Sequence, residues 1–181
     1  HANQKELLPV SDLYEKGISL WGTSKSFGMA GLRTGWLVTQ DKKLLDQFLA
    51  FKDYLSICTS PTSEVLTAIA VNNFTTFIQP NIKKIERNIL LFETFVKRHS
   101  NLMTFVRPKA GSTGFVEMNI KESTLAFSNQ LVGKTGIMTV PAEMFQFPGK
   151  YLRIGFGREN LPSVLEILDE YLVQHYVQQR K

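Results

Sequence analysis

The chain has 181 residues, a single cysteine, three histidines and no long apolar run. Cys58 cannot form an intramolecular disulfide, and such sparing cysteine usage is typical of a reducing compartment. We expect Cys58 to be a small buried or half-buried apolar side chain. No run is long enough to cross a bilayer as a helix, and no charged-then-apolar signal segment opens the sequence. The sequence therefore predicts a cytoplasmic protein without a membrane-spanning segment.

The sequence also has no strong bias of charge or composition. The net charge of +5 comes from scattered residues, and only the tail, 178–181, ends in a basic pair. We interpret that tail as a solvated helix end, so we expect no nucleic-acid surface. The apolar fraction of 43% and the charged fraction of 20% exclude disordered and collagen-like chains. The length suits one domain or two small ones.

Two glycine motifs of nucleotide-binding proteins are missing from the stretch around residue 25. Gly17 and Gly22 have the spacing of a P-loop, but Thr23 stands where that motif requires a lysine. No G-x-G-x-x-G occurs in the stretch, so a dinucleotide fingerprint is also absent. These absences argue against a P-loop phosphate site and a dinucleotide site, and we predict no metal site.

The first part of the chain predicts short strands followed by helices. Residues 18–21 and 36–39 read as buried strands, and Asp41 as the N-cap of a helix. The stretch 52–64, KDYLSICTSPTSE, reads as a loop whose end, Ser60-Pro61, starts a helix over about 62–77. We expect Pro80 to break that helix. The apolar positions of the next helix are Ile82, Ile85, Ile89, Phe92 and Val96.

Beyond Ser100 the pattern changes to strands with two helices among them. The segments TFV, GFVEMNI, IMTV and YLRIGF are strand-like, a helix is expected near 123–132, and Asn160 opens the last helix. Strands and helices alternate at both ends of the chain, so the fold class is α/β or α+β. We place a domain boundary near Pro80, giving domains 1–80 and 81–181.

Residues 21–38, WGTSKSFGMAGLRTGWLV, place an amine and a guanidinium between the two first strands. Lys25 lies between the apolar side chains Trp21 and Phe27, and burial there would favour the neutral amine that attacks carbonyl groups. Arg33 suits bidentate binding of a phosphate. The alternative is a solvated lysine, a surface arginine and glycines that only form tight turns. Together the two groups suit an aldehyde that carries a phosphate, such as pyridoxal 5′-phosphate (PLP).

The run GTSKSFGMAGLRTG resembles the lysine signature of the class I/II aminotransferases, the fold-type-I PLP enzymes. The resemblance implies that Lys25 forms a Schiff base with PLP and later moves a proton. It also implies that Arg33 grips the cofactor phosphate and that the hydroxyl of Ser24, or of Thr23, assists. The run departs from the family at Gly22, where many members have serine, and the aliphatic residue usual after Arg33 is a threonine here.

The segment YLRIGFG at 151–157 resembles the family segment that supplies the arginine for the substrate α-carboxylate, which is Arg153 here. Without the resemblance, Arg153 reads as a surface residue on a strand. We interpret Arg158 as a charge at the start of the last helix. Tyr54 or Lys52 stands where relatives contact the substrate side chain or a partner subunit, and a plain connector is the alternative.

The resemblance implies an aminotransferase that moves an amino group between an amino acid and a 2-oxo acid, as a homodimer. It covers nearly the whole chain but only the second half of the family. Residues 1–80 are then the remnant of the large PLP-binding domain, and 81–181 a connector helix with the small α+β domain. We expect a fragment, a truncated gene product or a partial record of a longer chain, with weak or no turnover by itself. His1 is either the residue after a missing aspartate or a cloning remnant.

Two alternatives remain open at this stage. One is another fold-type-I PLP reaction, such as β-elimination or a cyclising synthase, because the lysine motif does not select the bond that breaks. The narrower likeness of TSKSFGMAGLRTGWL, FKDYLSIC and LRIGFGREN is to a branch that includes capreomycidine-synthase-like proteins. The other is a non-catalytic domain that assembles with itself or with a partner.

Overall fold

A computed structural model describes residues 7–177, which form two compact units that meet between Asn81 and Ile82. His1 and the basic tail lie outside the described residues. In 7–177 no helix combines the length and apolarity needed to cross a membrane. The same residues contain no group of three or more His, Cys, Asp or Glu side chains placed to hold a metal ion.

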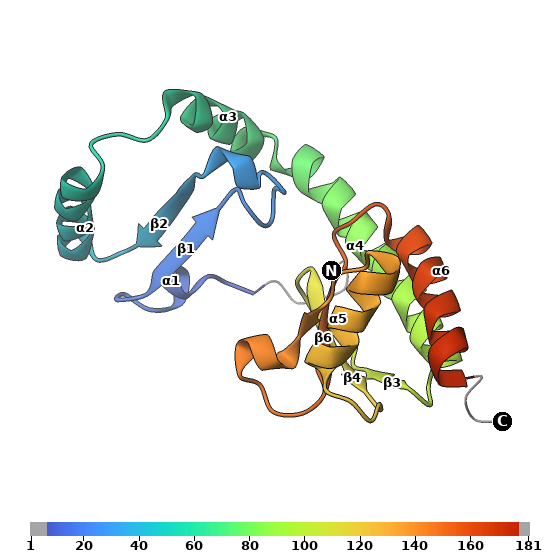
Figure 1. Ribbon diagram of the computed structural model, residues 1–181. Helices are drawn as coiled ribbons and strands as arrows, with labels where there is room; N and C mark the ends of the chain where they lie inside the picture. The colour runs from blue at the N-terminus through green and yellow to red at the C-terminus, as the bar shows by residue number, and fades with distance from the viewer. Residues whose placement is uncertain (1–6, 178–181) are drawn as a thin grey trace. The chain divides into compact units, whose positions relative to one another are not determined.

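The first unit contains a two-stranded antiparallel sheet accompanied by helices (Figure 1). Its elements are α1 (Val10–Leu13), β1 (Ile18–Gly22), the 3-10 turn η1 (Ala30–Leu32), β2 (Gly35–Thr39), α2 (Lys42–Leu55) and α3 (Pro61–Asn72). Both predicted strands are confirmed, but their predicted burial is wrong: Leu20 is 77% exposed and Leu37 40% exposed. A two-stranded ribbon leaves much of its surface without a covering layer in the described chain.

The helices of the first unit confirm two predicted caps and correct two other expectations. Asp41 accepts a hydrogen bond from the Leu44 N–H at 3.0 Å, and Ser60 accepts one from the Ser63 N–H at 3.4 Å. The predicted loop is wrong over 52–55, because α2 continues to Leu55 before the chain turns out. Cys58 lies in the short connection that follows and is exposed rather than buried.

The expected break at Pro80 is also wrong. Helix α4 (Phe74–Arg98) passes through Pro80, whose ring costs one backbone hydrogen bond but has a helical φ. The interruption falls at Asn73 instead. Asn73 is the C-cap of α3, and its φ of −120° and ψ of 33° lie outside the helical region. The Ile69 carbonyl accepts the ordinary helical bond from the Asn73 N–H at 3.1 Å and a second bond from Asn73 Nδ2 at 2.9 Å. The helix therefore ends where the backbone dihedrals of Asn73 change, and the Asn73 side chain adds a hydrogen bond to a carbonyl of the last turn.

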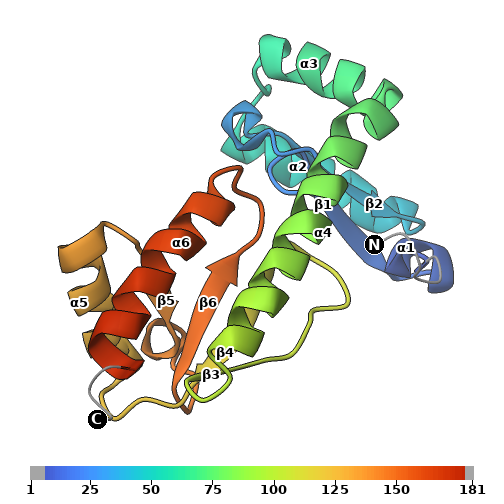
Figure 2. The same cartoon turned by 90° about the vertical axis from the view of Figure 1, so that its right-hand side faces the viewer.

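The second unit is one antiparallel sheet covered on one face by helices. Its elements are β3 (Met103–Phe105), β4 (Thr113–Met118), α5 (Thr124–Thr135), β5 (Val140–Pro141), the 3-10 turn η2 (Ala142–Phe145), β6 (Tyr151–Gly155), α6 (Leu161–Leu172) and the π-helical turn η3 (Val173–Val177), with part of α4. The strand order is β3-β4-β6-β5. In the view of Figure 2, β6 is seen between α4 and α6, which pack with α5 in the same core.

Strand alternation divides the two faces of this sheet. Val116 and Leu152 are 1% and 2% exposed and pack in the core with α4, α5 and α6. The residues one position away, Phe115 and Arg153, lie opposite one another in register and point to the other face. The core therefore fixes the strand that presents Arg153.

A buried amide ties α4 to the connection between β6 and α6. Asn88 is fully buried, and its Nδ2 donates to the carbonyls of Phe156 at 2.9 Å and Arg158 at 2.7 Å. Both acceptors belong to the segment that directly follows Arg153 on its strand. This amide therefore holds the segment after β6 to α4, together with the Phe156 N–H, which donates to the Ser112 carbonyl at 2.8 Å.

We predict that Asn88→Ala lowers the free energy of unfolding by about 2–4 kcal/mol, because two carbonyls lose their donor. Asn119→Ala, which removes an exposed amide bond to the Asn101 carbonyl, is the matched control and should cost less than about 1 kcal/mol. Urea unfolding followed by circular dichroism measures both. Equal losses in the two variants would contradict the constraint assigned to Asn88.

A carboxylate from η2 caps the start of α5. The Thr124 hydroxyl donates to Glu143 Oε2 at 2.6 Å, and the Leu125 N–H donates to Oε1 at 3.2 Å. The Thr124 hydrogen bond, with those from backbone N–H groups, lowers the pKa of Glu143 from its usual 4.5, although partial desolvation opposes the shift. The ionised carboxylate of Glu143 thus contributes its full stabilisation of the fold at pH values above about 4.5, the usual pKa of the group.

We predict that the stability difference between the wild type and Glu143→Gln is complete near pH 6 and shrinks as the pH falls below about 4.5. The unfolded carboxyl binds its proton first, so the contribution disappears as the pH falls through the lower folded pKa. Thermal unfolding at a series of pH values measures the difference. A difference that stays constant down to pH 3 would show that the charge of Glu143 does not matter.

Candidate functional site

The connection between β1 and β2 is a closed loop held by its own backbone. The Thr23 N–H donates to the Thr34 carbonyl at 3.1 Å, and the Met29 N–H donates to the Thr23 carbonyl at 3.0 Å. The Gly28 N–H donates to the Lys25 carbonyl at 3.1 Å. Gly28 has a φ of +70°, a conformation that favours glycine. Lys25 therefore lies in a tight turn inside the loop, between two residues that fasten it.

Lys25 and Arg33 both expose their side chains from this loop. Arg33 follows η1 and has a φ of 53°, which is uncommon for a residue with a side chain. Its Nη1 donates to the Ala30 carbonyl at 3.1 Å, which uses one of its five N–H donors. The amine is not enclosed by Trp21 and Phe27, so the predicted burial of Lys25 is not provided by the described residues.

The two hydroxyl residues before Lys25 have different surroundings. Thr23 is fully buried, and its hydroxyl lies 3.3 Å from the Met29 carbonyl and 3.2 Å from the Thr34 carbonyl. That hydroxyl hydrogen is therefore engaged in closing the loop. Ser24 is half-buried and next to the lysine. Of the two, Ser24 has the hydroxyl more accessible to a ligand.

Arg153 lies in the second unit, on β6, and its side chain is exposed. Within residues 7–177 no carboxylate pairs with it, whereas Arg87, Arg98 and Arg107 each face a glutamate or aspartate. Its guanidinium carbon lies 5.3 Å from the centre of the Phe145 ring. An exposed arginine without an internal anion suits an external one.

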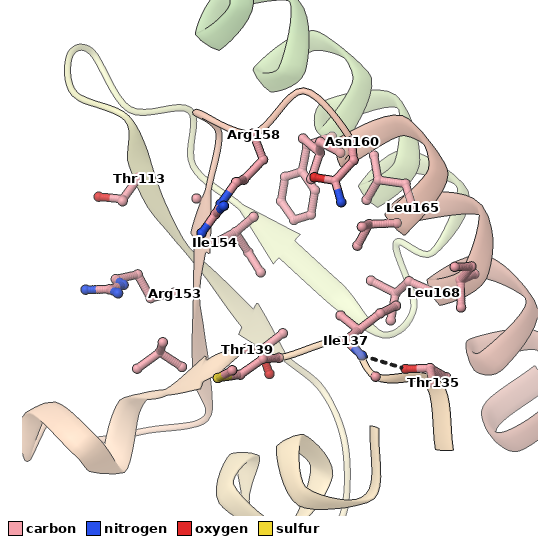
Figure 3. A pocket seen from close by; sticks show the side chains of 18 residues that line it. Thr113, Thr135, Ile137, Thr139, Arg153, Ile154, Arg158, Asn160, Leu165 and Leu168 are labelled. Atoms are coloured by element: carbon pink, nitrogen blue, oxygen red, sulfur yellow. Dashed lines mark hydrogen bonds between the residues drawn. The ribbon is translucent and has the colours of Figure 1, made fainter. Parts of the chain in front are cut away.

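A cavity of about 510 Å³ lies beside β6, and Arg153 and Arg158 are among the residues that line it. Figure 3 shows Leu165 and Leu168 on one side of β6, while the Arg153 side chain extends to the other side. The apolar part of this cavity is thus a space between sheet and helices. The guanidinium of Arg153 belongs to the opposite face of the sheet.

Tyr54 and Lys52, the two predicted substrate contacts, lie on helix α2 rather than in the predicted loop. Tyr54 belongs to the last turn of the helix rather than to a loop, and its side chain is 86% exposed. Lys52 Nζ donates to the carbonyls of Ser56 at 3.5 Å and Ile57 at 3.3 Å. Lys52 therefore caps the helix end, which leaves Tyr54 as the one with a free side chain of these two.

Two residues that the structure places beside Arg153 and its strand, Phe145 and Asn88, are not among the residues predicted from the sequence. The signal for Phe145 was the aromatic pair in MFQF, between two strand-like segments. Asn88 gave no signal, because a buried asparagine inside an apolar helix pattern looks the same as one on its polar face.

The chain matches the family model described as "Aminotransferase class I and II" over residues 7–168. It is 28% identical over 170 residues to a capreomycidine synthase of Streptomyces vinaceus, covering 92% of this chain and 43% of that protein. An aspartate aminotransferase of Thermotoga maritima is 23% identical over 170 residues, covering 92% of this chain and 42% of that protein. The chain thus spans less than half the length of these relatives.

Comparison with solved structures identifies the same family. The crystal structure of a PLP-dependent aminotransferase from Streptococcus suis superposes with a TM-score of 0.83 and 26% identity, covering 90% of this chain and 43% of that one. The α/β architecture is that of the C-terminal part of such enzymes. The lysine loop and the YLRIGFG strand lie inside the matched residues. The chain therefore belongs to the class I and II aminotransferase family, as its lysine signature indicated.

Proposed function

We propose that this chain is the lysine-bearing part of a PLP-dependent aminotransferase that moves an amino group between an amino acid and a 2-oxo acid. The observation that carries the proposal is the closed β1–β2 loop, which exposes an amine and a guanidinium eight positions apart. These groups fit PLP, which has an aldehyde for the amine and a phosphate for the guanidinium. When bound, PLP supplies the electron sink that stabilises a carbanion at the substrate Cα.

Each proposed residue has one task. Lys25 is the proposed catalytic residue: its amine would hold the cofactor at its aldehyde end and would move the proton of the substrate Cα. Arg33 binds the phosphate, with the hydroxyl of Ser24 as a second donor. Thr23 is proposed to act through the loop that it closes. In the second unit, Arg153 binds the substrate carboxylate, and Tyr54 is the proposed contact for the rest of the substrate.

We assign the two units to two different domains of the whole protein. Residues 1–80 correspond to the end of the large cofactor domain, and residues 81–181 to the connector helix and the small domain. A homodimer is proposed for the whole protein, because the apolar side chains of Leu20 and Ile57 in the first unit are 77% and 85% exposed. The exposed thiol of Cys58 supports a cytoplasmic, reducing location.

A second candidate reaction is a cyclisation on the same cofactor. It is favoured by the 28% identical relative, whose name is capreomycidine synthase. The residues of the loop serve both reactions equally, because the surroundings of the cofactor select the bond that breaks. Product analysis with a panel of amino acids separates them: a 2-oxo acid indicates amino transfer, and a cyclic amino acid indicates the alternative.

We predict that borohydride reduction after addition of PLP leaves the cofactor covalently attached to the peptide that contains Lys25. Lys25→Ala should lose this attachment, because no other amine of the chain lies in the loop, and mass spectrometry of the digest measures it. Lys43→Ala, which removes an exposed lysine of α2, is the matched control and should behave as the wild type. Attachment that persists in Lys25→Ala would contradict the proposal.

We predict that Arg33→Gly weakens PLP binding about tenfold or more, because a charge-assisted bidentate contact is lost. Glycine accepts the φ of 53° without strain, so the loop should keep its conformation and the loss reports on the guanidinium. Fluorescence titration with PLP gives the affinity. Arg87→Gly, outside the loop, is the control, and an unchanged affinity in Arg33→Gly would contradict its role.

A further inference from the structure

An aromatic cluster lies on the outer face of the sheet in the second unit, next to Arg153. We define this cluster as Phe115, Phe145, Phe147 and Tyr151. Ring centres are 5.9 Å apart for Phe115 and Phe145, and 5.7 Å apart for Phe115 and Phe147. The three phenyl rings are 39%, 45% and 49% exposed. Contiguous, half-exposed aromatic rings indicate a contact surface rather than core.

The guanidinium of Arg153 is held against this cluster. Its Cζ lies 5.3 Å from the centre of the Phe145 ring, and Phe115 lies directly across from Arg153 on β4. An aromatic face attracts the cation through its quadrupole. The N–H donors of the planar guanidinium remain available at its edge for a carboxylate.

The second unit contains an internal example of the complete arrangement. The Cζ of Arg98 lies 5.7 Å from the centre of the Phe95 ring, and its Nη2 is 3.6 Å from Asp169 Oδ1. Here an arginine over a phenyl ring forms an ion pair with a carboxylate of the same chain, which is also hydrogen-bonded to His99 Nε2 at 2.7 Å. Arg153 has the ring but, among the described residues, has no carboxylate. Moreover, Phe95 is 1% exposed, whereas Phe145 is open to solvent.

We propose that Arg153 and the aromatic cluster bind carboxylates that carry an aromatic or bulky apolar group. The inference rests on the proposed function for the role of Arg153 and adds the class of its substrate. Arg153 binds the carboxylate, while Phe115 and Phe147 contact the apolar group. Phe145 is a positioning residue for the guanidinium. A purely apolar partner is disfavoured, because it would cover the cation without pairing it.

The test is a side-chain NMR titration of the isotope-labelled chain, observing the Nε–H signals of Arg153 and Arg98. The probes are phenylacetate, acetate and benzyl alcohol. Phenylacetate should shift the Arg153 signal with an affinity about threefold to tenfold higher than that of acetate. Benzyl alcohol should bind more weakly than phenylacetate. The Arg98 signal is the internal control and should not move, because Asp169 occupies it.

Variants separate the ring from the charge. Phe145→Leu should reduce the affinity for phenylacetate about threefold and remove most of its advantage over acetate. Phe145→Tyr keeps the ring, so it should keep the wild-type affinity for phenylacetate and the wild-type advantage over acetate. Arg153→Gln lacks the Arg153 signal, so its binding is followed through the backbone N–H signals of Phe145 and Phe147, and it should abolish binding of both carboxylates. Circular dichroism confirms the folding of each variant, and a Phe145→Tyr that behaves as Phe145→Leu would overturn the role of the ring.

The outcomes distinguish this inference from the proposed function. Equal affinity for acetate and phenylacetate would overturn the substrate class and leave Arg153 as a carboxylate site. If neither carboxylate shifts the Arg153 signal, Arg153 is not a carboxylate site, which would overturn this inference and the role of Arg153 in the proposed function. An affinity for benzyl alcohol equal to that for phenylacetate would show an apolar surface that does not use the charge. Loss of phenylacetate binding at high protein concentration, with broadened signals, would show that a second copy covers the cluster and would overturn the inference.

Discussion

The structure of the site depends on the hydrogen bonds by which the β1–β2 connection closes on itself. Thr23 contributes its N–H, its carbonyl and its hydroxyl to that closure, all within one buried residue. These bonds join the two ends of the loop that carries both Lys25 and Arg33. Burial makes each of these bonds costly to lose, because the groups would remain without partners. The loop backbone is thus held by its own hydrogen bonds, while the side chains of Lys25 and Arg33 are exposed.

A second constraint operates in the other unit, where β6 is fixed between the core and the outer face. Leu152 is buried with the helices, and the next residue, Arg153, must point the other way. Asn88 fixes the segment that follows this strand through two carbonyls. The guanidinium therefore emerges at a defined place, above a phenyl ring and without an internal anion. In both units a buried polar residue orders the backbone beside an exposed cation.

Local patterns were sufficient to predict much of the fold. Asp41 and Ser60 were recognised as caps because a side-chain oxygen followed by a helical pattern has one favourable use. The strands around the lysine loop were recognised from β-prone runs, but their burial was not, since it depends on neighbours that a local pattern does not contain. The predicted break at Pro80 is wrong because proline removes one hydrogen bond of the helix but keeps a helical φ. The real helix end lies at Asn73, where the backbone leaves the helical region, and no local pattern of the sequence marks that position.

The candidate site was predictable only in its spacing. Lys25 and Arg33 follow from a motif, whereas the engaged hydroxyl of Thr23 and the helical setting of Tyr54 required coordinates. Phe145 was missed because it contributes through contact with Arg153, eight positions further along the chain. Lys25 and Arg33 can be recognised in the sequence because they belong to a motif, whereas Phe145 can be recognised only by its contact with Arg153 in the structure.

The central claim is that Lys25 and Arg33 hold opposite ends of one PLP molecule. A crystal structure of this chain grown with PLP tests it most directly. The account predicts electron density that is continuous from Lys25 Nζ to the aldehyde carbon of the cofactor, with the phosphate within hydrogen-bond distance of the Arg33 guanidinium. Density for the cofactor on another lysine, or a phosphate bound away from Arg33, would contradict it.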